Sequence, residues 1–145
     1  WLLLLLGVMS IIGNEIAGIV ASHNGVQKLP IVFILMTILS LVLGIALGNK
    51  ITGMLVLAAL CVVVIIYGTT IQLVFISVAE KEYPQSLALA TSLISIFANV
   101  GISLGSFTAS TTVNFANLTM LGYVGAVYGL LAIGLSFALR RFYRK

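Results

Sequence analysis

Residues 86–113 read SLALATSLISIFANVGISLGSFTASTTV, and this stretch decides the fold that the sequence predicts. It is long enough to cross a bilayer as one helix, because about 20 residues span the hydrocarbon core. Steps of three and four residues put six polar side chains on one helix face: Ser92, Ser95, Asn99, Ser103, Ser106 and Ser110. Polar groups are costly in hydrocarbon, so this polar stripe is expected to face other helices or a watery cavity. The alternative is that the hydroxyls bond to carbonyls four residues earlier and merely tolerate burial.

A seam of small residues runs beside the polar stripe. Gly101 and Gly105, flanked by Phe97 and Ala109, form a pair that lets a neighbouring backbone approach closely. Similar pairs recur at Gly44/Gly48 and Gly125/Gly129. A helix with one packing seam and one polar stripe is what a translocation pathway requires.

The composition indicates an integral membrane protein. Of 145 residues, 61% are hydrophobic and 7% are charged, whereas soluble domains carry about 25% charged residues. These values exclude a disordered chain and an ordinary soluble enzyme. The net charge is +4, but the cations cluster in residues 140–145, which favours a topology signal over a nucleic-acid surface.

Five apolar segments predict an all-α, polytopic membrane bundle of five transmembrane helices. They lie at about 1–21, 30–48, 53–79, 86–112 and 118–139, joined by short links that carry most of the remaining charge. Pro30 and Pro84 are expected at helix starts, where the missing N–H is tolerated.

The distribution of Lys and Arg over the links and the C-terminal end predicts how the helices are oriented across the membrane. With the C-terminus in the cytoplasm, every Lys and Arg except Lys50 lies inside, in agreement with the positive-inside rule. The N-terminus then lies outside, and the protein is expected in the plasma membrane. An odd number of helices that starts outside fits the back end of a larger bundle, so we treat 1–145 as one C-terminal transmembrane bundle of a longer chain.

No enzymatic constellation is present in the sequence. It contains one His, one Cys and no Asp, so no Ser-His-Asp triad, paired-carboxylate site or metal framework is visible. We therefore predict that the chain is not an enzyme and needs no cofactor or metal.

Two polar groups within hydrophobic segments are functional candidates. Glu15 lies roughly 10 Å inside the end of its helix, where a carboxylate is by default a functional hypothesis. The alternative is that its side chain extends to the cytoplasmic face, or makes a structural contact with His23 or Lys28. Gln72 closes the polar run 67–72 and needs hydrogen-bond partners in hydrocarbon. It could bind a substrate or cross-link to the polar stripe.

Three stretches carry a resemblance to a known family. Residues 13–18 (GNEIAG) with 21–28 (ASHNGVQK) resemble a signature, usually GNxxxGxxADRxGxRK, between helices eight and nine of that family. Ser22 and His23 stand where Asp and Arg are usual. Gln72 followed by residues 79–84 (AEKEYP) resembles the end of helix ten.

The third stretch resembles helix eleven of the same family through Ser92, Asn99, Gly101 and Gly105. Over essentially its whole length the sequence resembles the C-terminal half, helices eight to twelve, of a major facilitator superfamily transporter. The similarity is to the drug:proton and sugar-efflux antiporter branch, which is arabinose-efflux-permease-like.

The resemblance implies proton-coupled efflux of a small organic solute by alternating access between two six-helix bundles. Its implied partners are the lipid bilayer, a small-molecule substrate, the proton and an N-terminal portion of six to seven helices. It assigns the substrate cavity to Asn99, Ser92, Ser95 and Gln72, and coupling or gating to Glu15, Asn14, Gly18 and Lys28. Gly101 and Gly105 would allow helix shifts. The alternative function is a non-transporting membrane subunit or a truncated transporter remnant.

Overall fold

Five α-helices and one short 3₁₀ helix build the chain in the computed structural model, which describes residues 2–22 and 25–143. They are α1 (Leu2–Ser22), α2 (Gly25–Ala46), α3 (Lys50–Glu82), η1 (Pro84–Ser86), α4 (Leu87–Phe115) and α5 (Met120–Tyr143). The prediction of an all-α helical bundle is confirmed.

Four of the helices are long and apolar enough to cross a membrane. These stretches are Gln27–Ala46, Lys50–Glu82, Pro84–Phe115 and Met120–Arg141. Helix α1 has 21 residues. The apolar stretch described within it, Gly7–Val20, is shorter than those of the other four helices. Four of the five predicted spans thus meet the length and hydropathy expected of a transmembrane helix, and the span at 1–21 stays a prediction.

The start of α2 differs from the prediction. Pro30 was expected at a helix start, but α2 begins at Gly25 and Pro30 lies inside it. Only the first turn of a helix has N–H groups without an intrahelical partner, so Pro30 removes one hydrogen bond from the second turn. The polar residues Gln27 and Lys28 suggested a link, yet they belong to the first two turns of α2.

Helix α3 is longer than the predicted span 53–79. It runs for 33 residues, or about 50 Å, and its charged last turn continues the helix past the apolar core. Asn49 caps its start, since the Asn49 side chain accepts a hydrogen bond of 3.1 Å from the Ile51 N–H. Tyr83 ends the helix, and Pro84 then begins η1.

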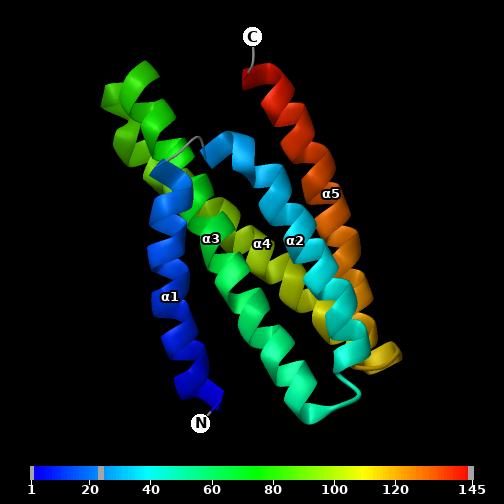
Figure 1. The fold of residues 1–145 in the computed structure, drawn as a ribbon. Coiled ribbons are helices and arrows are strands. Elements are labelled where there is room, and N and C mark those ends of the chain that lie inside the picture. The colour runs from blue at the N-terminus through cyan, green and yellow to red at the C-terminus, as the bar shows by residue number, and fades with distance from the viewer. Residues whose placement is uncertain (1, 23–24, 144–145) are drawn as a thin grey trace.

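Four helices lie side by side and the fifth crosses them. Helix α2 packs between α3 and α5, and α1 packs on the far side of α3. Helix α4 runs obliquely behind this layer and touches only α3, η1 and α5 (Figure 1). It therefore has the least contact with the rest of the described chain.

The α2–α5 interface is built from small residues. Its buried members on both helices follow steps of three, four or seven residues: Thr37, Ser40 and Gly44 on α2, and Gly122, Ala126, Gly129 and Ser136 on α5. A Cβ at Gly122 would lie 2.5 Å from the Ser40 carbonyl oxygen and 2.7 Å from the Gly44 Cα. The two backbones are in direct contact here, which is how membrane helices pack without a hydrophobic driving force.

The α1–α3 interface uses the same principle. Ala17 is fully buried and Gly13 is buried beside it. A Cβ at Gly13 would lie 3.3 Å from the Ile65 side chain. Ser10 adds a weak contact of 3.9 Å between its Oγ and the Sγ of Cys61.

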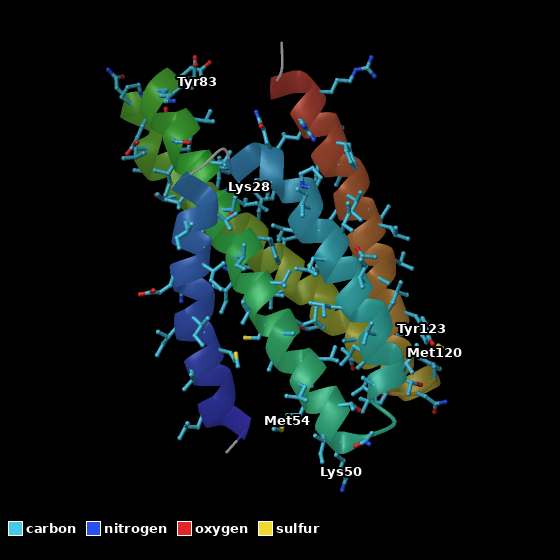
Figure 2. All side chains as sticks on the ribbon, viewed as in Figure 1. Lys28, Lys50, Met54, Tyr83, Met120 and Tyr123 are labelled. Carbon is cyan, nitrogen blue, oxygen red and sulfur yellow. The ribbon has the colours of Figure 1, made fainter. Side chains whose placement is uncertain are left out.

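The cations lie at opposite ends of the bundle in unequal numbers. Lys28 lies at the end where α5 finishes with Arg140 and Arg141, and Lys50 lies at the other end (Figure 2). This is the asymmetry that the sequence predicted; which end faces the cytoplasm stays a prediction. His23, Arg144 and Lys145 lie outside the described residues.

Candidate functional site

The polar stripe of α4 is exposed along its whole length. All six of its residues, from Ser92 to Ser110, are exposed. Ala90 and Leu93 face the other helices, and the stripe is rotated by roughly 150° around the helix axis from that side. The stripe therefore faces away from the described helices of this chain.

Hydrogen bonding divides the stripe into two kinds of residue. Ser92 Oγ donates to the Ala88 carbonyl oxygen at 2.9 Å, and Ser95 Oγ donates to the Thr91 carbonyl oxygen at 3.4 Å. Both hydroxyls are thus satisfied by their own helix, as the alternative interpretation expects. The Asn99 amide makes no hydrogen bond within the described chain.

Helix α4 contacts the other described helices near its two ends but not between them. Near its start Ala90 is buried, and near its end Thr108 Oγ1 and Tyr128 Oη are 2.9 Å apart in a hydrogen bond. Every residue in 95–107 is exposed. Asn99 therefore lies in the part of α4 that the described helices support least.

The predicted packing seam makes no contact within the described chain. No heavy atom outside the helix's own backbone lies within 4 Å of a Cβ built at Gly101 or Gly105. The close approach of backbones occurs instead at Gly122 and Gly129 of α5. A packing role for Gly101 and Gly105 requires a surface beyond the described residues and stays a prediction.

Gln72 is exposed on α3 and is not joined to the polar stripe. Its side chain makes no hydrogen bond among the described residues, so the expected cross-link to α4 is not formed. Its polar neighbours have structural roles. Thr70 is fully buried and donates to the Ile66 carbonyl oxygen at 2.7 Å, and the Tyr67 ring lies 5.5 Å from the Phe33 ring.

The coupling candidates of α1 share one exposed face. Asn14, Glu15 and Gly18 are exposed, opposite the packing residues Gly13 and Ala17. Asn14 Nδ2 donates to the Ser10 carbonyl oxygen at 3.0 Å.

The coupling candidates are not gathered into one site. Among the described residues, Glu15 forms no ion pair with Lys28, which is half-buried in α2. No contact joins α1 to α4, so Glu15 and Asn99 belong to separate sites within this chain.

A large apolar cavity lies between α2, α3, α4 and α5. Its volume is about 900 Å³, and it sits where α3 ends and α4 begins. None of the predicted substrate residues, Asn99, Ser92, Ser95 or Gln72, lines it. It is therefore distinct from the polar stripe. No pattern in the sequence indicates it, because leucine and alanine are common throughout the helices.

Comparison with known proteins supports a transporter. The chain is 24% identical, over 128 residues, to the uncharacterized MFS-type transporter YtbD of Bacillus subtilis (strain 168). The match covers 88% of this chain and 32% of that protein, so the chain spans about a third of its relative's length. No protein-family model matches the chain, and no solved structure is significantly similar to it. The similarity is thus to a membrane transporter of the major facilitator type, and the four long apolar helices agree with a multi-pass membrane protein.

Proposed function

We propose that this chain forms part of a secondary transporter for a small organic solute, in which α4 lines the translocation pathway. The similarity to an MFS-type transporter over 88% of the chain supports the general function. The geometry of α4 supports the assignment of the pathway to this helix.

One observation carries the proposal, namely the position of Asn99. Its amide is exposed, makes no hydrogen bond within the described chain, and lies in the middle of an exposed helical stretch. An amide in contact with hydrocarbon would leave two donors and an acceptor unsatisfied. Asn99 therefore needs water, a solute or further protein in front of it, and a pathway between two helical bundles supplies all three.

The finer assignment rests on the resemblance described above. We propose the C-terminal half of a proton-coupled efflux antiporter, with the polar stripe facing the six- to seven-helix portion of a longer protein. The exposed stretch 95–107 leaves room for that portion. Gly101 and Gly105 lie on another side of α4, where they would allow a further helix to approach closely. Gln72 would support the cavity, and Ser92 and Ser95 would line it.

The test is substitution of Asn99 in the full-length protein. Cells that express it are loaded with ethidium or with radiolabelled arabinose, and efflux is followed after energisation. Asn99→Leu is expected to abolish or strongly reduce efflux without changing membrane insertion. The matched control is Asn117→Leu, which removes an exposed amide from the turn after α4 and therefore lies outside the stripe.

Two outcomes would contradict the proposal. Unchanged efflux in Asn99→Leu would remove Asn99 from the pathway. A correctly inserted wild-type protein that exports none of the probes, in any direction of the proton gradient, would favour the non-transporting subunit.

Glu15 is proposed as the coupling or gating group, together with Asn14, Gly18 and Lys28. It is the only carboxylate in the described part of α1, and it is exposed on the face away from α3. Efflux by Glu15→Gln, measured over a range of pH, is expected to lose the pH dependence of the wild type. A wild-type pH profile in this variant would refute the coupling role.

A further inference from the structure

The apolar cavity has walls that suit hydrocarbon. Seventeen residues line it, and only Tyr83, Ser86 and Ser136 carry a polar side-chain atom. The Ser136 hydroxyl already donates to the Ala132 carbonyl oxygen at 2.6 Å. A polar solute bound here would leave most of its hydrogen-bonding groups without partners, so the cavity selects an apolar ligand.

Short side chains keep the cavity open. Ala79 on α3, Ala90 on α4, and Ala132 and Ala138 on α5 all line it. Its volume of about 900 Å³ is near the upper end of the range for ligand sites, which is about 300–1,000 Å³. Inside a bilayer the hydrocarbon available to fill such a space is a lipid acyl chain.

Cations adjoin the cavity along two of its helices. Lys28 directly precedes the lining residue Leu29, and Arg140 and Arg141 directly follow the lining residue Leu139. Lys28 and the lining residue Tyr83 lie at the same end of the bundle (Figure 2).

The net charge at this end is positive. On α3, Lys81 lies between Glu80 and Glu82, so the described charges near the cavity are four cations and two carboxylates. No ion pair among the described residues neutralises these cations. Basic pockets between transmembrane helices are suited to anionic lipid headgroups.

We propose that this cavity is a binding site for an anionic phospholipid. One acyl chain occupies the apolar space between α2, α3, α4 and α5, and the phosphate-bearing headgroup lies against Lys28, Arg140 and Arg141. The site is separate from the polar stripe, so it does not depend on the proposed transport function.

The test is lipid retention by the full-length protein, purified in mild detergent and observed by native mass spectrometry. The probes are phosphatidylglycerol, phosphatidylcholine with the same acyl chains, and oleate. Wild-type protein is expected to retain phosphatidylglycerol in preference to phosphatidylcholine. Arg140→Gln combined with Arg141→Gln is expected to reduce that preference about tenfold, because each cation near a headgroup adds to the attraction.

A second variant tests the cavity itself. Ala138→Trp places a large side chain in the space, and is expected to abolish retention of phosphatidylglycerol. Its matched control is Leu130→Trp, at a residue of α5 that is 61% exposed and does not line the cavity. Lys50→Gln, at the opposite end of the bundle, is the control for loss of charge.

Three results would overturn the proposal. Equal retention of phosphatidylglycerol by Ala138→Trp and by wild type would place the lipid on the outer surface. Equal retention of phosphatidylglycerol and phosphatidylcholine by the wild type would show that the cations do not select an anionic headgroup. Retention of oleate without phosphatidylglycerol would identify a fatty-acid site instead.

Discussion

The α2–α5 interface and the middle of α4 are built from similar residue types, but the first is buried and the second is exposed. Both contain Ser and Gly at steps of three and four residues. Between α2 and α5 these residues are buried and the backbones touch, whereas residues 95–107 of α4 are all exposed. Small and polar residues on one face of a membrane helix thus indicate that this face does not contact lipid. Whether it packs against another helix or stays open depends on the neighbouring helices.

The largest effect on stability is expected from Gly122→Ala, which disrupts the packed interface between α2 and α5. The added methyl group would meet the Ser40 carbonyl oxygen at 2.5 Å, and backbone atoms cannot give way as a side chain does. Forced separation of α2 and α5 is expected to destabilise the protein by about 3 kcal/mol. A thermal melt of the purified full-length protein measures the loss.

Gly134→Ala is the matched control for Gly122→Ala. No heavy atom lies within 4 Å of a Cβ at Gly134 on the same helix, apart from that helix's own backbone. The melting temperature is expected to stay the same or rise, because Ala favours a helix more than Gly does. Equal losses in the two variants would show that the α2–α5 contact does not decide stability.

A smaller effect is expected from Thr108→Val, which loosens the attachment of α4. It removes the hydrogen bond of 2.9 Å between Thr108 and Tyr128 and keeps a similar side-chain shape. Interhelical hydrogen bonds in membranes are worth about 0.6 kcal/mol on average. Hydrogen exchange in residues 104–112 should become faster, and Tyr128→Phe should give the same result. Unchanged exchange in both variants would show that this bond does not hold the end of α4.

The smallest effect on stability is expected from Gly101→Ala. A Cβ there meets no atom within 4 Å in the described chain other than its own helix backbone, so the bundle itself should not be destabilised. If the seam packs against further helices of a longer protein, transport should fall while the stability of residues 2–143 is kept. A loss of stability as large as that of Gly122→Ala would show that α4 packs more closely than the structure indicates.

The sequence predicts much of the fold for a physical reason. Apolar segments of about 20 residues can satisfy their backbone groups in a bilayer only as helices. The six-residue stripe on α4 is likewise a consequence of helical periodicity, and its exposed face agrees with the predicted need for a partner outside the helix.

Other features depend on neighbours, which spacing does not identify. The Gly101/Gly105 pair and the glycines of α5 have the same pattern, yet only those of α5 meet a facing backbone. The apolar cavity was not predictable either, because it arises from the oblique crossing of α4. Pro30 was misplaced because Gln27 and Lys28 are polar but helical.

The central claim, that the polar stripe of α4 faces a watery pathway, is tested most directly by cysteine accessibility in intact membranes. Cys61, the one cysteine of the sequence, is first replaced by Ser, and Asn99→Cys is compared with Phe97→Cys. Both positions lie in the exposed stretch, but on opposite faces of α4. A charged, water-soluble thiol reagent is expected to modify Asn99→Cys and to leave Phe97→Cys unmodified. Failure to modify Asn99→Cys, or equal modification of both, would contradict the assignment of α4 to the pathway.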